Sequence, residues 1–177
     1  MKHSLERRAF MQGAAAGALA APMLAAAARA HAGTALDPDP GYSFEVTRSD
    51  DAWRALLGDD DHAILRLAKT EKPRSSALWY EQREGSYHCK GCGLHVYDAK
   101  WKTIIDLGWV FFRQSVPDTV LMGIDFTKPY GDEMPLVLIE VHCRRCGSHF
   151  GHIITLLEDQ TLHCLNGASL TFNETPA

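Results

Sequence analysis

The sequence has no excess of positive charge. Its 18 lysines and arginines are outnumbered by 22 aspartates and glutamates, which gives a net charge of −4. Proteins that bind nucleic acids or anionic membrane surfaces usually concentrate Lys and Arg in a stripe or patch, and no such stripe stands out here. The charge pattern therefore predicts no nucleic-acid partner and no stable membrane association.

Residues 1–32 have the layout of an export signal. The charged start includes the pair Arg7 and Arg8, an apolar run rich in Ala and Gly occupies 11–28, and small residues at 30–32 offer a cleavage site. The arginine pair resembles a twin-arginine signal, which predicts a periplasmic protein. An alanine-rich helix of the folded domain and a membrane anchor are the alternatives, but the run is short and rich in Ala and Gly for a membrane span.

A linker and one domain are predicted to follow the signal. Residues 33–43 combine Pro38 and Pro40 with Gly and Asp, which is typical of a linker. Residues 44–173 are long enough for a single domain with a hydrophobic core, and no repeat stands out in them beyond two short cysteine motifs. We expect a monomer.

Cysteine is also scarce: there are five, and an odd number cannot all be paired. Four of them form two Cys-x-x-Cys motifs, namely Cys89 with Cys92 and Cys143 with Cys146. Two such motifs supply the four sulfur ligands that structural Zn²⁺ prefers, and Gly93 and Gly147 directly after them allow tight turns. Two disulfides are the alternative for an exported protein, but a Cys-x-x-Cys disulfide closes a small, strained ring. The spacing favours zinc.

The fifth cysteine, Cys164, is left over if the other four bind metal. A free cysteine is usually buried and inert. However, His149 and His152 lie nearby in the sequence, and Asn166 is two residues on, on the same side of an extended strand. Because histidine is the usual activator of a thiol, Cys164 is either an inert core residue or a nucleophile. A histidine replacing one cysteine on the metal is a less favoured third alternative.

The hydrophobic pattern predicts a mainly β protein with short N-terminal helices. Ser49 to Asp51 read as the start of a helix over 51–57, with Trp53, Leu56 and Leu57 on its buried face, and a second helical segment spans 60–70, burying Ile64, Leu65 and Leu67. Short β-branched and aromatic runs then predict antiparallel strands at 85–89, 94–97, 109–112, 119–122, 136–142, 150–157 and 168–172.

Several motifs together resemble one known family. They are Thr70-Glu-Lys-Pro73, Tyr87-His-Cys-Lys-Gly-Cys-Gly93, Gly108-Trp109, Glu140-Val-His-Cys143, Cys146-Gly-Ser-His-Phe-Gly-His152 and His163-Cys-Leu-Asn-Gly-Ala-Ser-Leu-Thr-Phe172. In this order they resemble the B-type peptide-methionine (R)-S-oxide reductases. The resemblance implies a zinc-stapled fold of two antiparallel sheets flanked by short helices, and reduction of methionine-R-sulfoxide.

The resemblance also implies a role for each candidate residue. Cys164 attacks the sulfoxide sulfur, His149 or His152 supplies a proton to the oxygen, and Asn166 orients a polar group. Trp109 forms an apolar wall for the substrate. The product at Cys164 is a sulfenic acid, which a second thiol must reduce. Because the chain has no sixth cysteine, we expect an external reductant, either a thioredoxin-like protein or a small thiol.

Three leucines depart from the family pattern. The family has Arg at the position of Leu138, Asp at Leu156 and Arg at Leu162, so charged groups of its pocket are lost. This predicts weakened activity or a shifted substrate, and restoring Leu156→Asp together with Leu162→Arg would test it. The alternative function is a non-catalytic zinc-stapled β module that binds a protein or a small ligand.

Overall fold

The computed structural model describes residues 42–126, 137–156 and 160–176. The predicted signal at 1–32 and nearly all of the predicted linker at 33–43 lie outside the described residues, so both remain predictions. Within the described ranges, no helix has the length and apolar character that a membrane crossing requires.

The N-terminal helical segment is α1 (Asp50–Leu67), which bends at its middle. Ser49 caps its start by accepting a hydrogen bond from the backbone N–H of Ala52, as Ser does at many helix N-termini. Gly58 adopts a positive φ of 74°, so the two predicted helical segments join across a kink.

The prediction that α1 buries Leu56 and Leu67 is wrong. Trp53, Ile64 and Leu65 are buried, but Leu56 is 53% exposed and Leu67 is 41% exposed. Leu56 belongs to the short first segment, which ends at the kink, and Leu67 is the last residue of the helix. Neither therefore continues the buried face formed by Trp53, Ile64 and Leu65.

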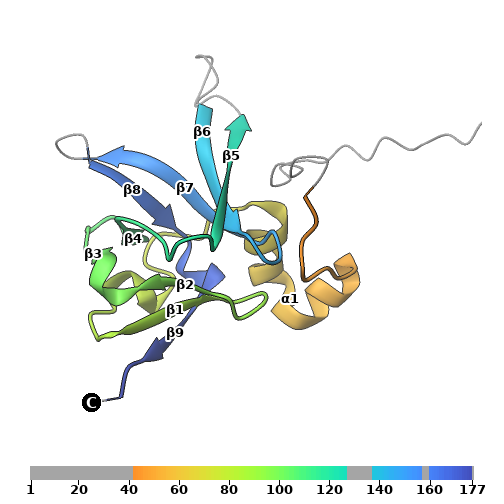
Figure 1. The fold of residues 1–177 in the computed structure, drawn as a ribbon, viewed down its shortest axis with the longest axis horizontal. Helices are drawn as coiled ribbons and strands as arrows, with labels where there is room; N and C mark the ends of the chain where they lie inside the picture. Colours follow the sequence, from red (N-terminus) through yellow and green to blue (C-terminus); the bar gives the residue numbers. More distant parts are fainter. Residues whose placement is uncertain (1–41, 127–136, 157–159, 177) are drawn as a thin grey trace, which may run out of the picture. The chain divides into compact units, whose positions relative to one another are not determined.

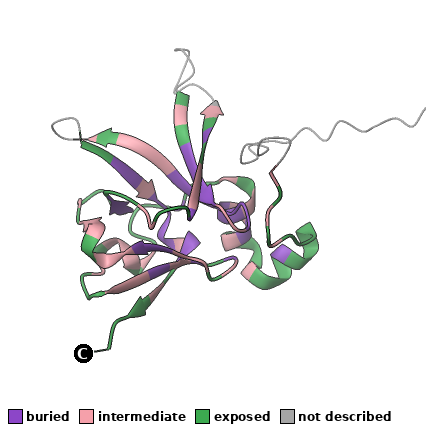
Figure 2. Ribbon diagram, in the orientation of Figure 1, coloured by how far each residue is buried: buried purple, intermediate pink, exposed green. Residues whose placement is uncertain are grey.

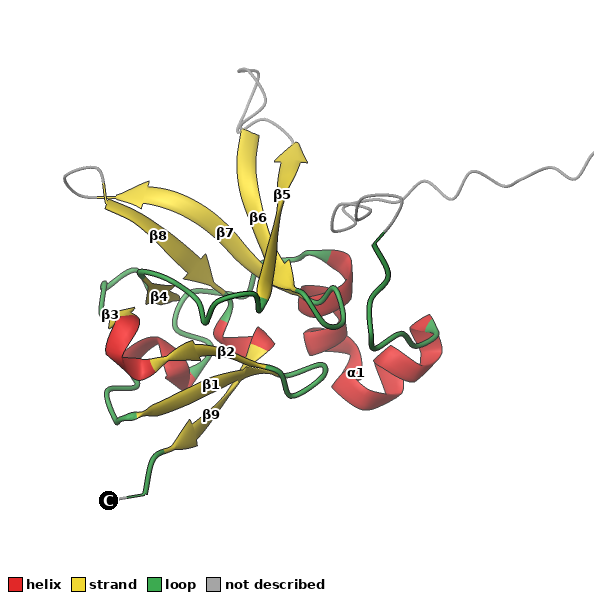
Figure 3. Ribbon diagram, in the orientation of Figure 1, coloured by secondary structure: helices red, strands yellow, loops and turns green. Residues whose placement is uncertain are grey.

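After α1, the described part of the chain forms nine strands in two antiparallel sheets (Figures 1 and 3). The strands are β1 (Gly85–Cys89), β2 (His95–Asp98), β3 (Lys102–Thr103), β4 (Val110–Phe112), β5 (Val120–Phe126), β6 (Val137–Cys143), β7 (His149–Leu156), β8 (Gln160–Leu165) and β9 (Leu170–Glu174). One sheet has the order β2-β1-β9 and the other β3-β4-β8-β7-β6-β5. Three short 3₁₀ helices, η1 (Ala77–Tyr80), η2 (Ala99–Trp101) and η3 (Gly167–Ser169), connect them. The predicted fold class is confirmed.

Aromatic side chains from both sheets make the core. Tyr87 of β1 and Tyr97 of β2 are fully buried against Phe112 of β4, with ring centroids 5.0 Å and 4.5 Å from that of Phe112. Phe150 of β7 is fully buried as well, and Figure 2 shows buried residues on strands of both sheets. Burial of such large apolar surfaces is the main stabilising contribution in a domain of this size.

The larger sheet forks between β6 and β7. These strands pair only from Ile139 opposite Ile153 to His142 opposite His149, whereas β5–β6 and β7–β8 continue as two longer antiparallel pairs. Beyond the shared stretch the two pairs diverge (Figure 1). Glu140, His152 and Cys164 lie at or beside this fork.

Candidate active site

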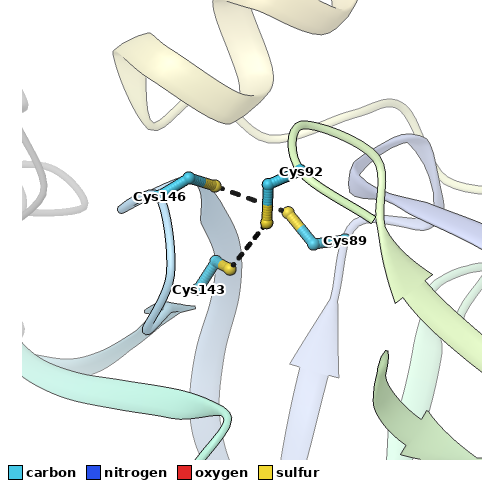
Figure 4. Close-up of side chains that lie close together, drawn as sticks. All are labelled: Cys89, Cys92, Cys143 and Cys146. Carbon is cyan, nitrogen blue, oxygen red and sulfur yellow. Dashed lines mark hydrogen bonds between the residues drawn. The ribbon is translucent and has the colours of Figure 1, made fainter. Parts of the chain in front are cut away.

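The four cysteines of the two Cys-x-x-Cys motifs meet at one point (Figure 4). The Sγ atoms of Cys89 and Cys146 are 3.7 Å apart and those of Cys92 and Cys143 are 3.5 Å apart; all four sulfurs lie within 4.8 Å of one another. A tetrahedral ion with bonds to sulfur of about 2.3 Å would place its ligands roughly 3.8 Å apart. All five cysteines are free thiols, so the structure favours a metal site over the disulfide alternative.

The two cysteine motifs share one backbone geometry. Gly93 N–H donates to the carbonyl of Cys89 and Gly147 N–H donates to that of Cys143, both at 2.8 Å, and both glycines have positive φ angles of 73° and 69°. The predicted tight turns are confirmed. One motif follows β1 of the smaller sheet and the other follows β6 of the larger sheet, so a metal ion would tie the sheets together.

An extra residue in β7 places His149 and His152 side by side. Val141 pairs with Gly151, but the next residue of β6, His142, pairs with His149, so Phe150 is an additional residue in a β-bulge. Residues three apart on a regular strand point to opposite faces, whereas the bulge brings these two rings to 5.3 Å between centroids. A side chain at Gly151 would clash with the carbonyl oxygen of Cys164 on β8, so the bulge also requires glycine there.

Each imidazole is held by a carboxylate from another strand. Nδ1 of His149 lies 2.5 Å from Oε1 of Glu140, and Nε2 of His152 lies 2.9 Å from Oδ2 of Asp125. Burial opposes ionisation of Glu140, but the hydrogen bond to His149 and the nearby imidazoles outweigh it and lower the pKa of the carboxyl group. Among the described residues, Nε2 of His149 is buried without a hydrogen-bond partner.

Cys164 lies beside these histidines on β8. It is directly opposite His152 on β7 and Phe111 on β4, and it is half-buried. Burial, with a smaller contribution from the negative charge of Glu71, raises the pKa of the Cys164 thiol to about 12. The thiol therefore carries its proton at neutral pH in the absence of substrate. The side chain of Cys164 lies on the same face of the sheet as that of its cross-strand partner His152, so an imidazole neighbours the thiol.

Glu71 connects Asn166 and Trp109. Its carboxylate accepts hydrogen bonds from the backbone N–H groups of Gly167 and Ala168 at 2.7 Å and 2.9 Å. Its own N–H donates to Oδ1 of Asn166 at 2.9 Å, and its carbonyl oxygen accepts from Nε1 of Trp109 at 3.3 Å. Asn166 in turn donates to the carbonyl of Phe150 in the bulge at 3.0 Å. One buried residue thus fixes both predicted side chains.

Replacing Glu71 with Ala should lower the free energy of unfolding by about 2–3 kcal/mol, because two N–H groups lose their acceptors in a largely buried turn. Glu71→Gln should cost less, since its amide oxygen can still accept one of the two bonds. Urea denaturation measures the difference. The exposed Glu84→Ala is the matched control and should change stability by less than about 0.5 kcal/mol. Equal effects at positions 71 and 84 would contradict this role.

The three departing leucines lie on the face of the sheet that carries the histidines and Cys164. Leu162 is two residues before Cys164 and pairs with Ile154, Leu156 is four residues after His152, and Leu138 is opposite Asp125. Leu162 is buried, and the other two are half-buried. Strand alternation therefore gives the site an apolar surround.

The structure brings the predicted residues into two groups. Four cysteines form a cluster that could hold a metal ion, and Cys164, His149, His152, Asn166 and Trp109 gather around β7, β8 and Glu71. Sequence reasoning missed the roles of Glu71, Glu140 and Asp125. Glu71 and Glu140 stand inside the motifs Thr70-Glu-Lys-Pro73 and Glu140-Val-His-Cys143, which could have singled them out, whereas Asp125 has no such local signal.

Comparison with known proteins identifies the family of the chain. The SelR domain family matches residues 57–174, which include all nine predicted site residues. Peptide methionine sulfoxide reductase MsrB of Pseudomonas putida is 34% identical over 109 residues, covering 62% of this chain and 79% of that protein. The MsrB of Herminiimonas arsenicoxydans is 33% identical over 135 residues (75% and 94%), and peptide methionine sulfoxide reductase B5 of Oryza sativa subsp. japonica is 33% identical over 143 residues (77% and 96%). The chain belongs to the SelR domain family.

Proposed function

We propose that this protein is a peptide methionine sulfoxide reductase that converts methionine-R-sulfoxide to methionine with Cys164 as the nucleophile. The observation that supports this best is the position of Cys164. The one cysteine outside the metal cluster lies directly opposite His152, whose ring contacts that of His149. A thiol beside two carboxylate-held imidazoles is an arrangement for nucleophilic attack with proton transfer.

The first step of the reaction needs only the Cys164 thiol and the sulfoxide. The Cys164 sulfur attacks the sulfoxide sulfur, the sulfur–oxygen bond of the substrate breaks, and the oxygen moves to Cys164 with the thiol proton. The sulfoxide is reduced to a thioether and Cys164 is oxidised to a sulfenic acid. An external thiol then forms a mixed disulfide with Cys164 and releases water, and a second thiol frees the enzyme.

The two imidazoles activate the oxygen rather than the resting thiol. The pKa of Cys164 is about 12, so little thiolate exists before substrate binds. A proton or hydrogen bond given to the sulfoxide oxygen makes its sulfur more electrophilic, which allows attack as the thiol proton leaves. With Nδ1 of His149 and Nε2 of His152 bound to carboxylates, Nε2 of His149 and Nδ1 of His152 are the nitrogens available for this task.

Trp109 and the leucines suit the apolar part of the substrate. The indole of Trp109 is fixed by its hydrogen bond to Glu71 and is half-buried, so its ring can contact a methyl or methylene group. Leu156 and Leu162 make the same face more apolar than the family pattern. We propose that this shifts substrate preference or weakens activity. The double variant Leu156→Asp with Leu162→Arg tests that proposal.

Zinc is the ion that the four-cysteine site fits best. Four thiolates from Cys89, Cys92, Cys143 and Cys146 can complete a closed tetrahedral site, which leaves no position for substrate. The metal would then stabilise the fold and take no part in the reduction. We further propose that the chain acts in the periplasm as a monomer, and the arginine pair at Arg7 and Arg8 supports export. Its reductant would be a thioredoxin-like protein or a small thiol, because the chain has no sixth cysteine to reduce Cys164.

A thiol-driven assay on the separate R and S epimers tests the function. We expect dithiothreitol-dependent formation of methionine from the R epimer and at least about 100-fold less from the S epimer, because a fixed nucleophile and proton donor accept one configuration at sulfur. Free methionine sulfoxide and a peptide containing it should both be assayed. Failure to reduce either epimer in either form would contradict the proposal and favour the non-catalytic binding module.

A further inference from the structure

Asp125 contacts the site from β5, an edge strand of the larger sheet. It is on β5, and β6 separates it from His152 on β7. Its Oδ2 lies 2.9 Å from Nε2 of His152, and the two side chains are 26% and 16% exposed. A charge-assisted hydrogen bond that is this well shielded from solvent holds a ring more firmly than a contact at the open surface.

The contact selects one hydrogen-bonding arrangement for His152. A carboxylate can only accept hydrogen bonds, so Nε2 of His152 must carry the hydrogen. A neutral ring held in this way has its lone pair on Nδ1, and a protonated ring has a second N–H there. In both states Nδ1 is the ring nitrogen that Asp125 does not occupy.

Within the ranges that the structure describes, the other charged and titratable groups facing His152 are already engaged or neutral. Glu140 is directly opposite His152 on β6, but its carboxylate is bound to Nδ1 of His149. His149 touches the His152 ring on the same strand, and Cys164, protonated at neutral pH, is opposite on β8. Of these described groups, Asp125 is the one whose carboxylate holds the second imidazole.

We propose that Asp125 is a positioning residue for sulfoxide reduction, which holds His152 through Nε2 so that Nδ1 faces the substrate oxygen. This inference rests on the proposed function. Asp125 does not touch the reacting atoms; it acts through His152, as carboxylates behind functional imidazoles do elsewhere.

Leu138 makes this arrangement possible. It is the direct cross-strand partner of Asp125 on β6, and its side chain offers no charge to the carboxylate. An arginine at the same position could bind Asp125 with two parallel hydrogen bonds and draw it away from His152. Leu138→Arg should therefore reproduce the loss of Asp125 while leaving residue 125 unchanged.

Single-turnover rates test the proposal. Wild type, Asp125→Asn, Asp125→Ala and Leu138→Arg are mixed with excess R-sulfoxide without reductant, and methionine formation is followed by rapid quenching. We expect a fall of about tenfold or more for Asp125→Ala and Leu138→Arg, a smaller fall for Asp125→Asn, and little change in the substrate concentration at half-maximal rate. Leu138→Met is the size reference for Leu138→Arg. Asp118→Asn, an exposed aspartate two residues before β5, is the matched charge control.

The second readout does not depend on activity. Long-range ¹H–¹⁵N NMR of the imidazoles should show His152 as the Nε2–H tautomer in the wild type and a mixture in Asp125→Ala and Leu138→Arg. Unchanged rates in both variants, or an unchanged His152 tautomer, would overturn the proposal. A wild type inactive on both epimers would instead overturn the proposed function, and the NMR comparison would still show whether Asp125 holds His152.

Discussion

Cys164→Ser should abolish methionine formation, with a loss of at least about 10⁴-fold in the thiol-driven assay. A serine hydroxyl is a poor nucleophile toward sulfur and cannot be oxidised to a sulfenic acid, so neither half of the proposed cycle can proceed. The variant should nevertheless fold, because Ser is close to Cys in size and Cys164 is half-buried outside the metal cluster. Methionine is quantified by chromatography after a fixed time.

The matched measurements are metal content and thermal unfolding of the same variant. We expect one metal ion per chain and an unfolding temperature close to that of the wild type. In addition, wild-type protein treated with one equivalent of R-sulfoxide should acquire one sulfenic acid, detected by mass spectrometry after dimedone labelling, and Cys164→Ser should acquire none. Residual turnover of Cys164→Ser near the wild-type rate would show that another group reduces the sulfoxide.

Loss of the metal should unfold the domain. Cys143→Ser removes a buried ligand, and structural zinc sites contribute roughly 10–16 kcal/mol of apparent binding free energy, which matches or exceeds the total stability of an ordinary domain. The cluster joins residues 51 and 57 positions apart in the sequence, so the metal also closes long loops whose ordering costs entropy. Near-UV circular dichroism and metal analysis of the purified variant measure the effect.

The control for this prediction compares the two motifs. Cys89→Ser, from the other sheet, should unfold the protein as thoroughly as Cys143→Ser, because both sulfurs belong to the cluster that would hold the one ion. A strong chelator under mild denaturant should reproduce the effect in the wild type, and added zinc should reverse it. A metal-free protein with an intact near-UV spectrum would show that the aromatic core alone holds the sheets together.

Much of this arrangement is predictable because its signals are local. Cys89 and Cys92 are close in sequence, and Gly93 beside them already indicates the turn, so the four-cysteine cluster could be predicted from spacing. Most strands are also visible as β-branched or aromatic runs. The strand that carries Cys164 begins with polar residues at Gln160 and Thr161, and β3 has two residues, so neither could be delimited from pattern alone.

The partners of the two histidines could not be predicted in the same way. Glu140 and His149 are nine positions apart, Asp125 and His152 are 27 apart, and Glu71 meets Gly167 across 96 positions. The two histidine contacts depend on strand register, and the Glu71 contact joins a loop to η3; no short motif encodes either kind of contact. The predicted burial of Leu56 and Leu67 is wrong because tertiary packing, and not local pattern, decides it. The apolar periodicity extends to positions that no other element covers.

The bulge in β7 has a consequence for anyone who wishes to transplant this chemistry. Copying the two imidazoles onto an unbroken hairpin at their native interval would send one ring into the opposite layer, and moving them to alternate positions would change their angle and separation. A graft would need the inserted phenylalanine and the neighbouring glycine as well. The backbone irregularity is therefore as necessary to the design as the two histidine side chains.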